Sequence, residues 1–332
     1  MQNNDIASVR KIAILTSGGD APGMNAAIRA IVIAAQHYKM ETIGFLAGFN
    51  GLIDDISTPL STKDVANIIH KGGTILKSAR CPAMKTSIGI KQAASTLLKH
   101  KIDALIVIGG DGSFTGGTVF NKEFGFPIIG IPGTIDNDIF GTSHTLGYDT
   151  ALNTAVDAID KIRDTASSHN RLFFVEVMGR DAGFIALNAG VGAGAEEILI
   201  PEEDLGLDRL LESLKKSRRS GKSSSIVVVA EGDKSGKNVY ELAQYVEDNM
   251  PEYEVRVSVL GHMQRGGSPT CFDRVLASRL GVKAVELMLD GTTNVMVGLK
   301  DNKVMATNLE KAIKGQHSIN SELLRVSDIM TT

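Results

Sequence analysis

The chain has 332 residues, of which 35 are glycine (about one in ten, against an average of ~7%), and its 43% hydrophobic and 22% charged residues exclude an intrinsically disordered protein. The longest apolar runs are far shorter than the ~18–20 residues of a membrane-spanning helix, and the polar first ten residues lack the apolar core of a signal peptide. The net charge of −3 lacks the basic excess of a protein that grips long nucleic acids.

Short apolar runs alternate with helical stretches along the chain. Lys11–Leu15 predicts a strand, and a glycine-containing turn and a helix over Asn25–Gln36 follow it. Further strands are predicted over Ala104–Ile108, Pro127–Ile131, Leu172–Val177, Glu197–Ile200, Ser225–Ala230 and Glu254–Leu260. Continuous apolar strands separated by helices are typical of parallel sheets covered on both faces. We therefore predict a doubly wound α/β fold that binds its ligands at the carboxyl ends of the strands.

The first of three glycine-containing clusters, Thr16–Asn25, joins a predicted strand to a predicted helix. Glycines there let the backbone approach a ligand closely, and the N–H groups that begin the helix favour an anion. A tight turn without a ligand is the alternative. The segment is not a P-loop, and Gly221-Lys222-Ser223 has Lys216 where a P-loop has its first glycine. Gly190–Ala195 fits a dinucleotide-binding pattern, but it follows a helical stretch and is predicted as a helix end.

The second and third clusters bring carboxylates to strand ends. Asp111 lies in Gly109–Ser113, where a single carboxylate beside phosphate oxygens would suit Mg²⁺. Asp136 and Asp138 lie in the segment that follows the strand ending at Ile131. At that spacing one carboxylate can act as a base while the other organises metal or water. Taken singly, each cluster could also be a structural turn.

Arginines near the predicted strand ends supply local positive charge, although the net charge of the chain is negative. A guanidinium group matches the oxygens of a phosphate, whereas a lone arginine is usually a solvated surface residue. Glu231 directly follows the apolar run Ile226–Ala230, where it could accept a hydrogen bond from a sugar hydroxyl or lie exposed. The arginines are Arg80, Arg163, Arg171, Arg180, Arg256 and Arg265. Together these residues predict an enzyme that transfers a phosphoryl group between two anionic ligands around Mg²⁺.

These motifs resemble those of the bacterial ATP-dependent 6-phosphofructokinases. The resemblance runs from about Lys11 to Asp290. A Gly-Gly-Asp-Gly segment by itself also occurs in diacylglycerol-kinase-like and NAD-kinase-like proteins, whereas the ordered set is highly specific. That set consists of Gly18–Asn25, Gly109–Ser113, Pro132–Asp138, Met178–Arg180 and Gly261–Pro269.

The resemblance implies roles for the residues that match the family's catalytic and nucleotide sites. Asp136 would take the proton from the sugar 1-hydroxyl, with Asp138 assisting, Thr134 in contact with the substrates and Arg180 stabilising the transition state. Asp111 would hold Mg²⁺. The ATP site would comprise Gly19, Arg80, Cys81, Gly110, Asp111, Gly112 and Ser113, with Phe49 near the adenine.

The resemblance also implies a fructose 6-phosphate site and an oligomer. The sugar phosphate would contact Thr134, Ile135, Asp136, Met178, Gly179, Arg180, Glu231, His262, Met263, Gln264 and Arg265. Arg171 and Arg256 match arginines that reach the substrate from a neighbouring subunit. The expected assembly is therefore a homotetramer with shared active sites.

Two further sets of positions bear on the phosphoryl donor and on regulation. Pyrophosphate-using relatives typically hold Asp and Lys where this chain has Gly112 and Gly133, so ATP is the expected donor. Arg29, Arg163 and Lys222 match a basic effector site between subunits. Other basic residues common in that site are replaced by Ile33, Thr62, Ser220 and Ser223. We therefore expect ADP to activate weakly or not at all.

The expected enzyme is an ATP:D-fructose-6-phosphate 1-phosphotransferase of glycolysis, built from two doubly wound, mostly parallel-sheet domains with the active site in the cleft between them. Residues 1–147 and 260–310 would form the larger, ATP-binding domain, and residues 148–259 and 311–332 the smaller, fructose-6-phosphate-binding domain. The two cysteines have no metal-type spacing, so we expect a cytoplasmic protein. The net charge and the short apolar runs lead us to expect no nucleic-acid or membrane partner. A pyrophosphate-dependent enzyme, a kinase for another anionic metabolite and a catalytically silent regulator remain alternatives.

Overall fold

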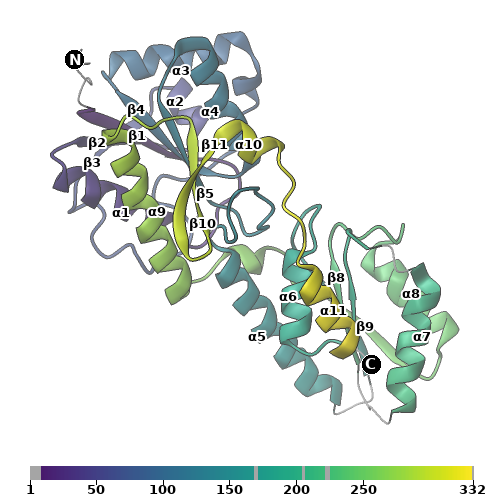
Figure 1. Ribbon diagram of the computed structural model, residues 1–332. Coiled ribbons are helices and arrows are strands. Elements are labelled where there is room, and N and C mark those ends of the chain that lie inside the picture. The colour runs from purple at the N-terminus through teal and green to yellow at the C-terminus, as the bar shows by residue number, and fades with distance from the viewer. Residues whose placement is uncertain (1–8, 168–170, 204–205, 221–224, 331–332) are drawn as a thin grey trace. The chain divides into compact units, whose positions relative to one another are not determined.

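The computed structural model describes residues 9–167, 171–203, 206–220 and 225–330 (Figure 1). Its chain divides into two compact units, each built around its own sheet. Unit 1 comprises Met1–Ile135, Ile139–Asp149 and Arg265–His317, and unit 2 comprises Asp136–Asp138, Thr150–Gln264 and Ser318–Thr332.

Unit 1 contains a seven-stranded sheet in the order β11-β10-β5-β4-β1-β2-β3. The strands from β10 to β2 are parallel, and antiparallel β11 and β3 form the two edges. Every residue of β4 is buried, because helices cover both faces of the sheet. The strands are β1 (Lys11–Thr16), β2 (Glu41–Phe45), β3 (Ser57–Leu60), β4 (Ala104–Gly109), β5 (Ile128–Pro132), β10 (Val295–Lys300) and β11 (Lys303–Asn308).

Two groups of helices cover this sheet (Figure 1). On one face α1 (Met24–His37) packs against α9 (Cys271–Leu289). A Cβ at Gly281 would lie 2.7 Å from the Ala30 Cβ, so glycine permits this close approach. The other face carries α2 (Phe49–Ile53), α3 (Ser87–Lys99), α4 (Asp111–Phe124) and α10 (Leu309–Lys314), with the 3₁₀ helix η1 (Pro82–Lys85) preceding α3.

Unit 2 contains a four-stranded parallel sheet in the order β7-β8-β6-β9. The strands are β6 (Arg171–Val177), β7 (Glu197–Leu199), β8 (Ser225–Ala230) and β9 (Glu254–Val259). Figure 1 shows α6 (Phe184–Gly192) and α11 (Ser321–Met330) on one side of this sheet, and α7 (Gly206–Arg219) and α8 (Val239–Asn249) on the other. The longest segment of the unit runs from α5 (Tyr148–Ser167) to the 3₁₀ helix η2 (Gly261–Arg265), and the chain returns to the unit with α11.

The predicted fold class is confirmed. Every predicted strand and the first predicted helix are present, and Gly190–Ala195 lies at the end of α6 as expected. Four strands were not predicted, namely β2, β3, β10 and β11. The two edge strands lack a continuous apolar run because most of their residues are partly or fully exposed. Within the described ranges, no helix combines the length and the apolar character needed to cross a membrane.

Glu197 in β7 carries a buried carboxyl group whose charge opposes folding. Burial raises its pKa above the ordinary value of 4.5, outweighing hydrogen bonding to Ser213 and the charge of Arg209. The folded-state pKa therefore exceeds the unfolded one. The protonated carboxyl group is therefore favoured by folding. The stability that this group contributes is complete below its unfolded-state pKa and is lost as the pH rises through its folded-state pKa.

We predict that Glu197→Gln raises the melting temperature at about pH 7.5 and that this gain shrinks toward about pH 4. The shift should be roughly 2–4 °C for each kcal/mol of relieved destabilisation in a domain of this size. Thermal unfolding followed by circular dichroism at both pH values measures it. A gain of equal size at the two pH values would contradict the raised pKa.

Candidate active site

The three glycine-containing clusters meet at the carboxyl ends of three neighbouring strands of unit 1. β5, β4 and β1 are adjacent and parallel, and the clusters follow them directly. The backbone N–H of Ser17 donates to the Ile108 carbonyl at 3.0 Å, and that of Gly133 donates to the Gly109 carbonyl at 3.0 Å. The clusters therefore form one continuous surface of backbone groups, which is where doubly wound folds bind ligands.

Gly109 is a glycine because the backbone of the first cluster passes directly over it. A Cβ at this position would lie 2.5 Å from the Ser17 carbonyl oxygen and 2.5 Å from Ser113 Oγ. The Ser113 hydroxyl is buried and donates to the same Ser17 carbonyl at 3.0 Å. Ser113 therefore holds the first two clusters together, in addition to the nucleotide contact predicted for it.

The two glycines predicted to select the phosphoryl donor have different surroundings. A Cβ at Gly112 would meet no atom of the protein within 4 Å, so the first turn of α4 faces open space there. A Cβ at Gly133 would lie 3.0 Å from Met24 Cε and 3.1 Å from Ile108 Cγ2. The packing of unit 1 therefore favours a glycine at Gly133, whereas at Gly112 only a ligand would require one.

Asp111 is the first residue of α4, directly after the N-cap Gly110. A carboxylate in the first turn of a helix faces the positive end of the helix dipole. The described residues contain no cluster of three or more His, Cys, Asp or Glu side chains suited to hold a metal ion. A carboxylate at the start of this helix fits Mg²⁺, which takes one or two carboxylates and completes its shell with phosphate oxygens and water.

Arg265 and Gly19 lie against each other in unit 1. A Cβ at Gly19 would lie 1.9 Å from Arg265 Nη1, so the guanidinium group occupies the space that any larger residue would fill. The Nε atom of Arg265 is buried without a hydrogen-bond partner among the described residues. This arrangement leaves a cationic donor beside the glycine turn, as an anion-binding role requires.

Arg80 and Cys81 lie in the loop before η1, and Arg80 is exposed. Phe49, expected near the adenine, is instead 2% exposed and stacks on Phe120 with ring centroids 6.2 Å apart. It belongs to the hydrophobic core beneath α4, because α2 turns its ring inward. Its place near the adenine stays a prediction.

Thr134 and Ile135 follow β5 in unit 1, whereas Asp136 and Asp138 group with unit 2. Thr134 offers its carbonyl to the Thr145 hydroxyl at 2.6 Å. Asp136 is only 8% exposed, and the intervening Asn137 has φ 54°. That left-handed conformation is one that Asn adopts more readily than most residues, and it gives the segment a defined turn.

In unit 2, the segment Met178–Arg180 forms a strained turn that Glu231 supports. Arg180 has φ 58°, in the left-handed region. Glu231 Oε1 accepts from the backbone N–H of Arg180 at 2.6 Å and from that of Gly179 at 3.3 Å. A Cβ at Gly232 would lie 2.1 Å from the Arg180 carbonyl oxygen, so the end of β8 packs directly on this turn. Glu231 therefore stabilises the backbone of the Arg180 turn, in addition to the sugar contact predicted for it.

The negative charge of Glu231 reaches a second carboxyl group. Glu176 lies one residue before the end of β6, and burial, with a further contribution from Glu231, raises its pKa. The carboxylate that supports the Arg180 turn is thus part of a small acidic pair within unit 2.

One carboxylate brings Arg171 and Arg256 together. Arg171 on β6 pairs in register with Glu254 on β9, and its Nε donates to Glu254 Oε2 at 3.0 Å. The other oxygen of Glu254 accepts from Arg256, two residues further along the same strand. The hydrogen bond from Arg171, followed by the charges of both arginines, lowers the pKa of Glu254. Sequence reasoning missed Glu254, although the alternation Glu254-Val255-Arg256 places both charges on one face of the strand.

The predicted sugar-phosphate contacts around η2 are not alike. His262 and Met263 are exposed, whereas Gln264 is completely buried. Its Oε1 accepts from the Met178 N–H at 3.3 Å, and its Nε2 donates to the Gly261 carbonyl at 3.1 Å. Both polar ends are used inside unit 2, so Gln264 supports Met178 here and we propose no substrate contact for its side chain.

Of the predicted effector residues, Arg29 lies partly buried on α1 in unit 1, and Arg163 lies on α5 in unit 2. Arg163 Nη2 donates to the Ala193 and Gly194 carbonyls at 2.8 and 2.7 Å, beyond the end of α6. Arg163 Nη1 lies 3.7 Å from a carboxylate oxygen of Glu196. The chain itself therefore uses this guanidinium group. Lys222 lies outside the described residues.

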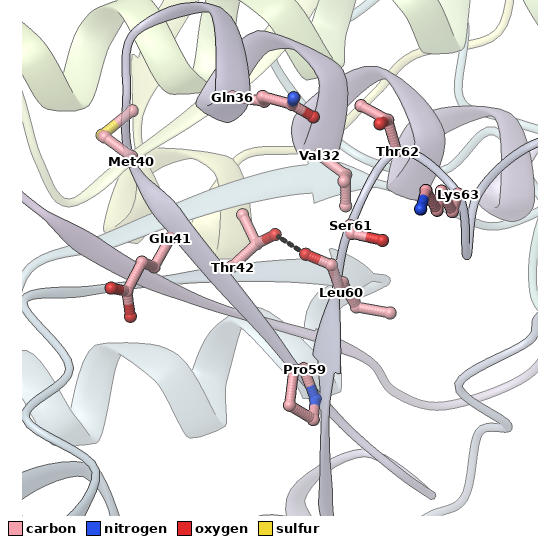
Figure 2. A pocket seen from close by; sticks show the side chains of 10 residues that line it. All are labelled: Val32, Gln36, Met40, Glu41, Thr42, Pro59, Leu60, Ser61, Thr62 and Lys63. Atoms are coloured by element: carbon pink, nitrogen blue, oxygen red, sulfur yellow. Dashed lines mark hydrogen bonds between the residues drawn. The ribbon is translucent and has the colours of Figure 1, made fainter.

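A pocket of about 550 Å³ lies between α1 and the antiparallel strands β2 and β3 in unit 1 (Figure 2). Thr62 and Lys63 line it, and across its floor the Thr42 hydroxyl donates to the Leu60 carbonyl at 2.7 Å. Lys63 is the single cation of its lining within the described ranges. Such a pocket holds a polyphosphate poorly, since each charge-assisted bond contributes roughly 1.5–3 kcal/mol.

Comparisons with known proteins identify the family. A family model described as Phosphofructokinase matches residues 11–288. The chain belongs to the phosphofructokinase family. It is 50% identical over 321 residues to the ATP-dependent 6-phosphofructokinase 2 of Bacteroides thetaiotaomicron, covering 97% of this chain and 98% of that one. It is 51% identical over 322 residues to the ATP-dependent 6-phosphofructokinase 1 of Thermus thermophilus, covering 97% and 99%.

Solved phosphofructokinase structures share the fold. The structure of phosphofructokinase from Saccharomyces cerevisiae superposes with a TM-score of 0.88 at 33% identity. The match covers 97% of this chain but 46% of the yeast chain, which is more than twice as long. A pyrophosphate-dependent phosphofructokinase from Marinobacter aquaeolei superposes with a TM-score of 0.82 at 21% identity, covering 95% and 86%. That second likeness concerns the fold alone.

We predict that Glu231→Ala lowers phosphofructokinase turnover by about ten- to a hundredfold, the effect of losing a hydrogen bond to a charged group. Glu231→Gln keeps an oxygen that can accept from the Arg180 N–H, so it should retain most of the activity. Steady-state kinetics measure the difference, with melting temperatures as the folding control. Equal losses in the two variants would show that the support of the Arg180 turn is not what matters.

Proposed function

We propose that this chain is an ATP-dependent 6-phosphofructokinase, which transfers the terminal phosphoryl group of ATP to O1 of fructose 6-phosphate. The observation that carries the proposal is the identity of about 50% over nearly the full length of enzymes named for this activity. The meeting of three glycine-containing clusters at adjacent strand ends supports it, because such a surface can accommodate phosphates. The products are fructose 1,6-bisphosphate and ADP.

Asp136 acts as the base in the proposed reaction. Its carboxylate takes the proton of the sugar 1-hydroxyl as O1 forms a bond to the terminal phosphorus, and the bond from that phosphorus to the bridging oxygen breaks to release ADP. Its low exposure supports this role, because a base that is shielded from bulk water can be held in one position against the substrate. Asp138, which lies two residues further along the chain, assists Asp136 in the proposed reaction.

The charge that develops on the transferring group is met by backbone and guanidinium donors. The Gly19 N–H, Arg80 and Arg180 fill these roles in the proposal, and positioned donors of this kind supply much of the rate enhancement in phosphoryl transfer. Support comes from the absence of a side chain at Gly19 and from the hydrogen bonds that fix the backbone of Arg180. Mg²⁺, when bound through Asp111, would neutralise phosphate charge, and a carboxylate at the start of α4 fits it.

Fructose 6-phosphate binds, in this proposal, to Met178–Arg180, Glu231, His262, Met263 and Arg265. Arg171 and Arg256 act on the substrate of a neighbouring subunit in a cytoplasmic homotetramer. Their shared bond to Glu254 supports this assignment, because it holds two guanidinium groups side by side on the β9 edge of the sheet. Light scattering of the purified protein would measure the number of chains.

Two alternatives are less well supported. The pyrophosphate-dependent structures that superpose on this chain are only 21% identical to it, against about 50% for the enzymes named ATP-dependent. A catalytically silent regulator would not need Asp136, Asp138, Asp111 and Arg180 together. We also propose that ADP activates weakly or not at all, since Thr62 in the pocket and Ile33 on α1 replace basic residues.

A coupled assay with fructose 6-phosphate, Mg²⁺ and either ATP or pyrophosphate tests the function. We predict turnover with ATP, and a loss of several orders of magnitude in Asp136→Ser because no other group would take the proton. The variant should still bind fructose 6-phosphate, which calorimetry measures. Unchanged turnover would remove Asp136 from the mechanism, and a higher efficiency with pyrophosphate would overturn the choice of donor.

A second substitution tests the donor through the open space at Gly112. We predict that Gly112→Asp folds normally, because its Cβ meets no protein atom and an acidic residue suits the first turn of α4. The new carboxylate should repel the phosphates of ATP and lower kcat/KM for ATP by about a hundredfold or more. Gly112→Ala is the matched control and should retain ATP use. Equal activity in the Asp and Ala variants would contradict the proposed place of the nucleotide.

A further inference from the structure

Asn25, the second residue of α1, directs its whole side chain to one loop of unit 1. It is 2% exposed. Its Nδ2 donates to the Lys71 carbonyl at 3.1 Å and to the Gly72 carbonyl at 3.0 Å, and its Oδ1 accepts from the Ile75 N–H at 2.7 Å. A carboxamide has two N–H donors and one carbonyl oxygen, so both kinds of group are used here. These bonds join α1 to a segment 46–50 residues away.

The same loop continues to Arg80 and is joined there to the glycine turn. The Ser78 hydroxyl donates to the Gly18 carbonyl at 3.0 Å, and the Gly18 N–H donates to the Ala79 carbonyl at 3.3 Å. Closer to Asn25, the Thr74 and Thr16 hydroxyls lie 3.0 Å apart. Asn25 thus fixes one end of a loop whose other end lies beside Gly18 and Gly19.

The opposite side of the loop is closed by the segment that follows Arg265. A Cβ at Gly72 would lie 2.3 Å from the Gly267 carbonyl oxygen, and the Ser268 hydroxyl donates to the His70 carbonyl at 2.6 Å. The loop is therefore held between two backbone segments, and a shift at Gly72 would disturb both of them. Because these hydrogen bonds and close packing leave little room for displacement, the position of the loop is set by these contacts.

We infer that Asn25 is a positioning residue that fixes Arg80 relative to the Gly18–Gly19 turn. The inference rests on the proposed function, in which Gly19 and Arg80 contact the phosphates of ATP. An aspartate would lose both donated bonds, and an apolar residue would leave two carbonyl groups and one N–H of the loop without this partner. Correct placement of a charged group within a fraction of an ångström is what phosphoryl transfer requires of its surroundings.

Hydrogen exchange tests the anchoring without reference to the reaction. In Asn25→Ala, the amides of Ile75 and of the residues up to Arg80 should exchange about tenfold or more faster than in the wild type. The control Thr42→Val loses a buried hydroxyl bond to the Leu60 carbonyl in the same unit and should leave these amides unchanged. Unchanged exchange in Asn25→Ala would overturn the inference.

A double-mutant cycle with Arg80→Ala tests the consequence for the reaction. Asn25→Ala alone should lower kcat/KM for ATP by about a hundredfold relative to the wild type. When Arg80→Ala is already present, adding Asn25→Ala should lower kcat/KM by less than about tenfold relative to the Arg80→Ala single variant. Additive losses would show that Asn25 does not act through Arg80 and would overturn the inference. A wild-type protein that transfers no phosphoryl group from ATP would instead overturn the proposed function, and the exchange experiment would still decide the anchoring.

A milder variant covers the possibility that Asn25→Ala fails to fold. Thr74→Val removes the contact with the Thr16 hydroxyl and the bond that the Leu76 N–H donates to Thr74 Oγ1 at 3.2 Å. It should change amide exchange and kcat/KM in the same direction as Asn25→Ala, by a smaller factor, and the same cycle with Arg80→Ala should be non-additive. Wild-type values in both measurements would overturn the inference.

Discussion

The close approach of backbone to backbone at the ends of β1, β4 and β5 is the constraint on which unit 1 depends. Gly109 has no room for a Cβ because Ser17 passes over it, and the buried Ser113 hydroxyl bonds the same carbonyl. Such packing leaves main-chain groups, rather than side chains, to form the surface at the strand ends. The glycine-rich sequence and the parallel strands are therefore aspects of one arrangement, and a bare backbone of this kind suits the phosphate binding that we propose for it.

In unit 2, the groups proposed to bind the substrate are held in place in a different way. There, a carboxylate rather than a glycine turn organises the reactive groups. Glu231 holds the left-handed Arg180 through backbone N–H groups, and Glu254 holds two arginine side chains directly. Glu231 fixes the backbone of one arginine and Glu254 fixes the guanidinium groups of two, so in the proposed function a chain of net charge −3 would still present local positive charge to a sugar phosphate.

Much of this could be predicted from the sequence, because apolar runs and glycine clusters report directly on buried strands and on the turns that follow them. The edge strands β3 and β11 were missed because they lack a continuous apolar run, whereas β2 and β10 are mostly buried but short, and a glycine interrupts each of them. Local pattern also cannot say which way a side chain points. Phe49 turned out to be core and Gln264 an internal hydrogen-bonding residue, while Asn25 and Glu254 proved to hold other groups in place. Each of these depends on contacts with residues distant in the sequence.

The order of the chain through its two units has a consequence for its biosynthesis. The α1 helix packs against α9, β5 pairs with β10, and α6 packs against α11, so both units draw on the last fifth of the sequence. Neither can be completed while the ribosome is still adding those residues. The faces of α1, β5 and α6 stay uncovered in the nascent chain until α9, β10 and α11 have been synthesised, and proteins dominated by such distant contacts fold slowly. Chaperones that shield apolar surface would therefore have their greatest effect during the synthesis of this protein, before α11 leaves the ribosome.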